Sequence, residues 1–340
     1  MKYNPLGKSG LLVSELCLGA MIFGENTSRG ADQPTAERII HKYLDLGGNH
    51  LDTANVYADG RSEEIVGAAI QGRRNQVVLA TKVRFATGPG PNDQGLSRYH
   101  ILQSVEASLR RLRTDVIDLL YAHCWDPITP LDETLRAFDD LVASGKVRYI
   151  GVSNFKAWQL MKALSTSEAH GWSRFVAAQY QYSLVERNIE HEIRELCLNE
   201  GLGLTPWGPL GGGFLSGKYQ PGSKPEQGRL AMMPDETEEA WHRRARESNW
   251  NILQVVDEIA KARQASYSQI ALAWLLRQPA VSSVIIGVRT LEQLEDNLAA
   301  CRVALGEDEL NRLDQASRPD EPYPYRFIQQ YGSRNPNPER

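Results

Sequence analysis

The chain has 340 residues, of which 41% are hydrophobic and 24% are charged, and its formal net charge is −4. This composition is typical of a globular protein and excludes a disordered or fibrous chain. Lysine and arginine are interspersed with acidic residues, so we expect no nucleic-acid partner. The N-terminus has no apolar signal-peptide core, and no apolar run is long enough to span a membrane. We therefore expect a cytoplasmic protein without a membrane partner.

The chain carries no pattern typical of a metal or disulfide framework. Its cysteines, Cys17, Cys124, Cys197 and Cys301, lie far apart and form no Cys-x-x-Cys pair, which suits a reducing compartment. The first predicted strand leads into "CLGAMIFG", which supplies no His-x-His pair of metal ligands. We expect no metal.

The first predicted element is a β-hairpin around Lys8, Ser9 and Gly10, which we expect to plug the bottom of a barrel. Eight apolar, often β-branched runs follow, each a predicted strand. They cover residues 15–19, 49–52, 77–82, 117–123, 148–154, 175–179, 202–207 and 283–287. Eight parallel strands that alternate with helices close into a barrel. The sequence thus predicts an α/β protein with the (β/α)8 TIM-barrel fold, with residues 1–340 in a single domain.

Segments with helical periodicity lie between these runs. The predicted helices cover residues 35–46, 62–70, 99–112, 131–144, 156–169, 190–200 and 290–299. Two stretches exceed what a barrel needs: a long loop after the seventh strand, at 208–249, and a C-terminal tail at 317–340. Long loops in compact domains are usually functional or mobile. The tail could pack near the barrel mouth or project freely.

The predicted strands end on polar or aromatic residues, and in a TIM barrel the catalytic residues lie at the carboxyl ends of the strands. These ends are Asp52 with Tyr57 just beyond it, Lys82, His123, Ser153 with Asn154, Gln179, Trp207, and Gly287 leading to Arg289. Each residue alone has an ordinary explanation as a turn former, a cap or a surface charge. A carboxylate, a phenol, an amine and an imidazole at one mouth, however, form a proton-transfer constellation.

Asp52, Tyr57, Lys82 and His123 have a joint chemical purpose. A phenol is a poor acid at neutral pH, and a neighbouring ammonium at Lys82 should lower the pKa of Tyr57. Asp52 would position the lysine and balance its charge, while His123 would orient a carbonyl oxygen. Proton delivery to that oxygen complements hydride delivery to the carbon. The set therefore implies reversible carbonyl reduction with a nicotinamide cofactor.

The whole chain resembles the aldo-keto reductases, in the long-loop branch that includes the β subunits of voltage-gated potassium channels. The matching segments, in family order, are "LDTANVYADGRSEEIVG", "LATK", "DVIDLLYAHCWDP", "GKVRYIGVSNF", "AAQYQYSL", "TPWGPLGGGFLSGKY" and "VIIGVRTLEQLEDNL". They cover most of residues 1–317. The resemblance implies that Tyr57 is the general acid/base and that Asp52, Lys82 and His123 complete a catalytic tetrad.

The resemblance also implies an NADP(H) site along the mouth. Ser153, Asn154 and Gln179 would hold the nicotinamide carboxamide, and Trp207 would stack on the nicotinamide ring. The other cofactor-binding candidates are Met21, Asp52, Gly208, Pro209, Leu210, Leu215, Ser216, Gly217, Lys218, Arg229, Gly287, Arg289, Gln293 and Asn297. The candidate substrate-pocket residues are Phe23, Tyr57, Phe85, His123 and Trp125.

Arg289, at the start of a predicted helix, would supply charge for a 2′-phosphate, so we expect NADPH rather than NADH. The run "GGFLSGK" fits a phosphate-binding loop, but Tyr219 follows where Ser or Thr should hold magnesium, which argues against nucleotide hydrolysis. The alternative function is a cofactor-binding regulatory or redox-sensor subunit, like the potassium-channel β subunits. The expected partner is a small carbonyl or alcohol substrate, and a homo-oligomer is possible.

Overall fold

Eight parallel strands form the centre of the computed structural model, which describes residues 1–24, 30–222 and 224–332. The strands are β3 (Leu16–Gly19), β4 (His50–Asp52), β5 (Val78–Val83), β6 (Ile117–Ala122), β7 (Val147–Ser153), β8 (Phe175–Gln179), β9 (Gly203–Leu204) and β10 (Val284–Gly287). They lie in the order β10-β3-β4-β5-β6-β7-β8-β9. The ring closes where the Ile285 amide donates to the Pro206 carbonyl at 2.9 Å. The eight predicted strands and the predicted (β/α)8 barrel are confirmed.

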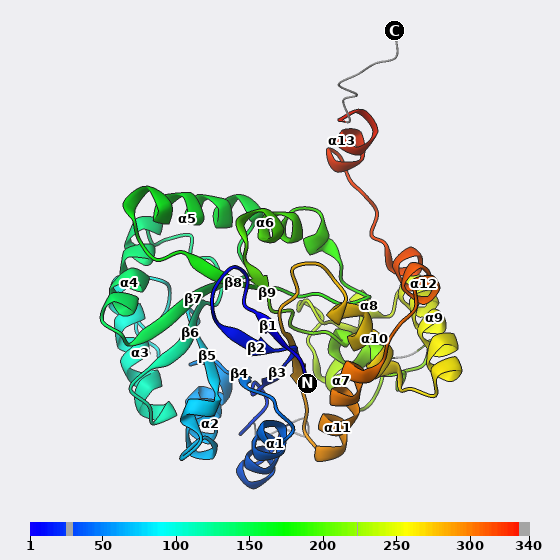
Figure 1. Cartoon of the computed structure of the whole chain (residues 1–340), viewed down its shortest axis with the longest axis horizontal. Helices are drawn as coiled ribbons and strands as arrows, with labels where there is room; N and C mark the ends of the chain where they lie inside the picture. The colour runs from blue at the N-terminus through cyan, green and yellow to red at the C-terminus, as the bar shows by residue number, and fades with distance from the viewer. Residues whose placement is uncertain (25–29, 223, 333–340) are drawn as a thin grey trace.

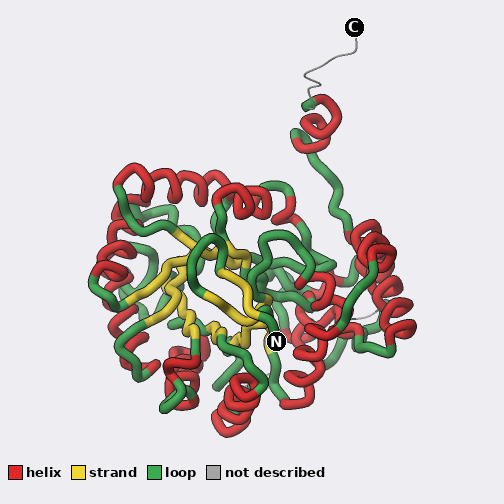
Figure 2. Tube along the Cα trace, in the orientation of Figure 1, coloured by secondary structure: helices red, strands yellow, loops and turns green. Residues whose placement is uncertain are grey.

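Helices surround the strands as an outer ring (Figure 2). The helices that the periodicity predicted are α1 (Gln33–Asp45), α2 (Arg61–Ala69), α3 (Arg98–Leu112), α4 (Leu131–Ala143), α5 (Ala157–His170), α6 (Ile193–Glu200) and α11 (Leu291–Ala299). The structure also contains helices that the periodicity did not predict: α9 (Glu247–Arg263), α10 (Tyr267–Leu276), α12 (Glu307–Ser317) and α13 (Tyr325–Tyr331). Helix α10 is buried along most of its length, so it lacks the polar stripe by which a surface helix is recognised.

The core has two layers, because alternate residues of each strand point to opposite sides of the sheet. On β5, Val78 and Ala80 face the inside of the barrel, where they pack with Leu119 and Tyr121 of β6. Leu79, Val83 and their counterparts on β6 belong instead to the larger layer between the strands and the helices. This alternation determines which side chains face the inside of the barrel and which face the helices.

The N-terminal hairpin closes one end of the barrel, as predicted. Strands β1 (Tyr3–Pro5) and β2 (Leu12–Ser14) pair antiparallel and lie across the ring of strands (Figure 1). Leu6 and Val13 are fully buried in the inner layer. A Cβ at Gly7, where φ is +60°, would lie 2.4 Å from the Gly201 carbonyl oxygen, so only glycine allows this close approach.

The long segment 208–249 is folded and contains η4 (Gly211–Ser216), α7 (Arg229–Met232) and α8 (Trp241–Arg244). The rings of Tyr219 and Trp241 pack with centroids 5.8 Å apart, and the Trp250 ring packs against that of Trp241 with centroids 6.2 Å apart. Lys218 lies in irregular backbone and begins no helix, so the run "GGFLSGK" is not a Walker loop.

The described part of the C-terminal tail projects away from the barrel, with α13 at its end (Figure 1). A stacked contact between the rings of His191 and Tyr325, with centroids 5.1 Å apart, joins this helix to the body. Residues 333–340 of the predicted tail lie outside the described residues. Among the helices that the structure describes, none has the length and apolar character needed to cross a membrane.

Candidate active site

The predicted tetrad comes together where β4, β5 and β6 end. Asp52 is the last residue of β4, Tyr57 begins η1 (Tyr57–Gly60), Lys82 lies in β5, and His123 follows β6. The Lys82 ammonium donates to the Asp52 carboxylate and, at 2.8 Å, to the Thr53 carbonyl. It lies 4.9 Å from the centroid of the Tyr57 ring. The rings of Tyr57 and His123 meet edge to face with centroids 5.7 Å apart.

Lys82 is fully buried, yet its ammonium is favoured. Burial alone would lower the pKa of Lys82, but the Asp52 carboxylate and the Tyr57 oxygen raise it above the usual value. The other Asp52 oxygen accepts a 2.9 Å hydrogen bond from the Gln179 amide. The charge of the lysine is therefore balanced inside the barrel, and the carboxylate that balances it is held in place.

Tyr57 keeps its proton at neutral pH. Burial raises the pKa of its phenol, and although Lys82 lowers it, the net shift is upward. The ammonium lowers this pKa, as expected from the sequence, but desolvation is the larger effect and sets the net direction. A protonated phenol next to a fixed ammonium can donate a proton, and the ammonium then stabilises the phenolate that remains.

His123 is a neutral imidazole at the tetrad. Burial lowers its pKa most, and the charges of Lys82 and Arg84 lower it further. Its Nδ1 atom is buried and has no hydrogen-bond partner in the described part of the chain. The Phe85 ring packs edge to face against it at 4.7 Å. A neutral imidazole in this position can donate a hydrogen bond to a substrate oxygen without delivering a positive charge.

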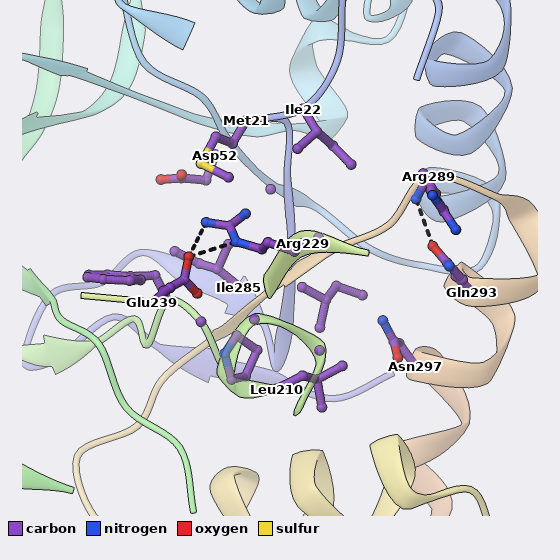
Figure 3. A pocket seen from close by; sticks show the side chains of 18 of the residues that line it. Met21, Ile22, Asp52, Leu210, Arg229, Glu239, Ile285, Arg289, Gln293 and Asn297 are labelled. Carbon is purple, nitrogen blue, oxygen red and sulfur yellow. Dashed lines mark hydrogen bonds and ion pairs between the residues drawn. The ribbon is translucent and has the colours of Figure 1, made fainter. Parts of the chain in front are cut away.

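An elongated cavity of about 580 Å³ opens at the tetrad and extends to the amino end of α11. Figure 3 places Met21 and Asp52 at one end and Arg289, Gln293 and Asn297 at the other. The predicted site residues that line it are Met21, Asp52, Tyr57, Phe85, His123, Ser153, Asn154, Gln179, Trp207, Gly208, Pro209, Leu210, Ser216, Lys218, Arg229, Gly287, Arg289, Gln293 and Asn297.

The other predicted residues do not line the cavity. Lys82 lies beneath the cavity, with no exposed surface. Phe23 and Leu215 are buried in the outer core, and Gly217 packs under the Tyr267 ring. The Trp125 ring contacts Phe155, with centroids 5.0 Å apart, instead of facing the cavity. Residue type alone did not reveal these orientations, which depend on how each loop turns after its strand.

Polar side chains from β7 and β8 connect the tetrad to the cavity wall. The Asn154 amide donates at 2.9 Å both to the His123 carbonyl and to the Ser153 hydroxyl. That hydroxyl donates to the Gln179 carbonyl at 2.8 Å. This chain of hydrogen bonds fixes Ser153, Asn154 and Gln179 beside the reactive groups, at the position proposed for a cofactor carboxamide.

Three cationic side chains, Lys218, Arg229 and Arg289, line the cavity, with Arg289 at the end near α11 and Arg229 on the side of Asp52 (Figure 3). Burial and the charge of Arg289 lower the pKa of Lys218. Arg229 forms an ion pair with the buried Glu239, drawn as dashed lines in Figure 3. A Cβ at Gly213, where φ is +87°, would lie 2.8 Å from the Lys218 ammonium, so glycine at this position leaves room for the Lys218 side chain.

Sequence reasoning missed part of the wall: Gly19, Ile22, Val56, Gly212, Gly213, Gly228, Glu239, Ser268, Ile285, Ile286 and Asp296. Glu239 lies in the acidic run "DETEEA", where nothing in the sequence distinguishes it from its solvated neighbours. Ile285 and Ile286 belong to the predicted strand β10, whose position beside β3 could have indicated them. Among the described residues, no group of three or more His, Cys, Asp or Glu side chains is arranged to hold a metal.

The fold and the site together define a class of protein: a (β/α)8 barrel with a phenol, an imidazole and a buried lysine–aspartate pair at its mouth, beside a long, partly cationic cavity. The model of the aldo/keto reductase family matches residues 15–318, and the chain belongs to that family of oxidoreductases.

Related proteins cover nearly the full chain. An uncharacterized oxidoreductase, YrpG, of Bacillus subtilis is 41% identical over 92% of this chain and 95% of its own length. A probable voltage-gated potassium channel subunit beta of Arabidopsis thaliana is 37% identical over 96% of this chain and its whole length. Norsolorinic acid reductase stcV of Emericella nidulans is 36% identical over 96% of this chain and 83% of its own length.

Proposed function

We propose that the protein is an NADPH-dependent reductase of aldehydes and ketones, with the reverse oxidation of alcohols. The observation that carries this proposal is that the buried Lys82 ammonium lies 4.9 Å from the centroid of the Tyr57 ring. A phenol in that setting can release a proton to an oxygen and be left as a stabilised phenolate.

Each residue of the site has a separate role in the proposed reaction. His123 donates a hydrogen bond that orients the substrate oxygen, and Tyr57 transfers its proton to that oxygen. Lys82 stabilises the resulting phenolate, while Asp52 and Gln179 keep the ammonium in place. NADPH, when bound, supplies the hydride for the carbonyl carbon. In the reverse direction the Tyr57 phenolate accepts the alcohol proton.

The cavity fits an extended, phosphorylated dinucleotide. Lys218, Arg229 and Arg289 place positive charge along the cavity wall, where phosphates would lie, and Arg289 lies at the end near α11 (Figure 3). Ser153, Asn154 and Gln179 would hold the nicotinamide carboxamide, with Trp207 against the ring. The cationic end favours NADPH, because a 2′-phosphate adds negative charge there.

A second candidate function is a cofactor-binding regulatory or redox-sensor subunit. The relative in Arabidopsis thaliana, a probable potassium channel subunit beta, favours it. The relative in Emericella nidulans, by its name a reductase, favours catalysis instead. Binding of NADPH alone does not distinguish the two functions, because both require the same cavity.

Turnover distinguishes them. Purified protein is mixed with NADPH or NADH and a panel of aldehydes and ketones, and oxidation of the cofactor is followed by absorbance. We expect oxidation that depends on the carbonyl compound and is faster with NADPH. Tight NADPH binding without turnover of any panel member would favour the regulatory subunit, and equal rates with both cofactors would overturn the NADPH preference.

A further inference from the structure

Arg84 directly follows β5, at the next position beyond the tetrad lysine that the strand alternation would turn inward. Val78 and Ala80 point into the barrel, and Lys82 continues this alternation, so residue 84 follows on the same side. On β6, the residues that pair with Lys82 and Val83 are Tyr121 and Ala122. His123 comes next, and its amide donates to the Val83 carbonyl at 3.0 Å. The strand register therefore brings Arg84 beside His123, at the rim of the mouth.

The Phe85 ring connects this guanidinium to the reactive groups. The Arg84 guanidinium carbon lies 5.4 Å from the centroid of the Phe85 ring. Phe85 lines the cavity and its ring lies 4.7 Å from that of His123. A single aromatic ring thus separates the guanidinium from the imidazole. Electrostatics agree with this proximity, since Arg84 contributes to the lowered pKa of His123, after burial and Lys82.

Arg84 forms no ion pair within the described residues, unlike Lys82 and Arg229, although its charge reaches the nearby Asp126 carboxylate. Lys82 pairs with Asp52, and Arg229 pairs with Glu239. In the described parts of the chain, by contrast, no ion pair or side-chain hydrogen bond involves Arg84, and its Nε is buried without a partner. A half-buried guanidinium with unused donors favours a ligand that brings acceptor oxygens.

The neighbouring carboxylate is already engaged. Asp126, on the loop after β6, accepts hydrogen bonds from the amides of Leu96 and Ile128 and from the Thr129 hydroxyl, at 2.7 to 3.0 Å. These bonds hold the loop after β5 against the loop after β6. The Gly95 amide also donates to the Arg84 carbonyl at 2.7 Å. The backbone of Arg84 is therefore fixed by hydrogen bonds, as is expected for a residue that determines substrate specificity.

We propose that Arg84 binds a carboxylate on the substrate, so that the favoured substrates are aromatic aldehydes or ketones with a carboxylate on the far side of the ring. This inference rests on the proposed carbonyl reduction. The carbonyl oxygen lies at Tyr57 and His123, the aromatic ring packs along Phe85, and the carboxylate accepts hydrogen bonds from the guanidinium. The carboxylate lies away from the reacting atoms, so it contributes mainly to substrate binding.

The test compares 4-formylbenzoate with methyl 4-formylbenzoate, which differ in the carboxylate charge. The enzyme is saturated with NADPH, and the wild type is compared with Arg84→Gln and with Arg38→Gln, which removes an exposed charge from the outer face of α1. We expect the wild type to have a higher kcat/KM for the acid than for the ester. In Arg84→Gln the ratio of these two kcat/KM values should fall about tenfold, which corresponds to ~1.4 kcal/mol. The loss should appear in KM, and Arg38→Gln should keep the preference.

A binding measurement separates this inference from the proposed reaction. Calorimetry with 4-methylbenzoate, which cannot be reduced, is performed on the protein saturated with NADP+. Binding that weakens about tenfold in Arg84→Gln but not in Arg38→Gln supports the carboxylate site even if no carbonyl compound is turned over. Equal affinity and an equal acid-to-ester ratio in Arg84→Gln and the wild type would overturn it.

Discussion

Lys82 and Asp52 form an ion pair inside the barrel, in which the lysine side chain has no exposed surface and the aspartate side chain is 5% exposed. They come from neighbouring strands, β5 and β4, whose register sets Ala80 against Asp52. The pair is held by further bonds to the Thr53 carbonyl and the Gln179 amide. Two charges that are buried together in this way depend on each other, because each would be costly to bury alone.

Replacing Lys82 by Met should therefore destabilise the protein by ~3–5 kcal/mol, since the Asp52 carboxylate remains buried without its partner. The free energy of unfolding is measured in a denaturant titration. The double variant Lys82→Met with Asp52→Asn should recover part of this loss, because no charge is then left unpaired. A double variant as unstable as the sum of its single changes would contradict the coupling.

Tyr57→Phe removes the phenol oxygen but keeps the ring that packs against His123. We expect kcat for carbonyl reduction to fall by about 10²–10⁴-fold, the usual contribution of a positioned proton donor. The dissociation constant of NADPH, measured by fluorescence titration, should remain close to that of the wild type. Undiminished turnover with the cofactor bound would show that another group delivers the proton.

The ion pair between Arg229 and Glu239 joins two parts of the long segment over the cavity, and the carboxylate is 6% exposed. Arg229→Ala should weaken NADPH binding at least tenfold, because it removes a cation and leaves a buried carboxylate facing the phosphates. Adding Glu239→Ala should restore part of the affinity. Isothermal calorimetry on the four proteins of this cycle gives the coupling energy, and a value near zero would mean that the pair does not act at the cofactor site.

Arg289 tests the cofactor preference. Arg289→Ala should raise the dissociation constant of NADPH by about tenfold or more, while that of NADH changes little, because only NADPH carries the 2′-phosphate. Both constants are obtained by titration of the same protein sample. Equal losses for the two cofactors would place the role of Arg289 elsewhere on the dinucleotide.

The folded protein should lose stability in acid partly because of His50. This residue is fully buried, and its Nδ1 lies 3.0 Å from the Ser283 hydroxyl. Burial lowers the pKa of His50 from 6.5 to about 4. Because the folded pKa is the lower one, the stability gained from neutral His50 is complete above 6.5 and is lost as the pH falls toward 4. The loss amounts to about 3 kcal/mol.

His50→Gln should therefore reduce the difference in unfolding free energy between about pH 7 and pH 4. His242→Gln, on the exposed surface of α8, serves as the control and should leave that difference as in the wild type. Chemical denaturation at several pH values gives the comparison. An unchanged pH dependence in His50→Gln would mean that other groups dominate acid unfolding.

The sequence predicted much of the site because barrel geometry fixes where strand ends lie. Once eight strands are recognised, Asp52, Lys82 and His123 must share one mouth. It could not predict the acid that pairs with Arg229, since Glu239 stands among similar residues and only the folding of α7 and α8 brings it inside. It also could not separate Phe85, which lines the cavity, from Phe23, which is buried in the core.

By itself the sequence determined the eight-stranded barrel, its hairpin and the chemical types gathered at its mouth, because strand periodicity and strand-end residues are local features. Only the tertiary structure decided the direction in which the pKa of Tyr57 shifts and the pairing of the cations. Both depend on desolvation and on distances between segments far apart in the chain. Burial raises the phenol pKa more than the neighbouring ammonium lowers it, a balance that no spacing of residues reveals.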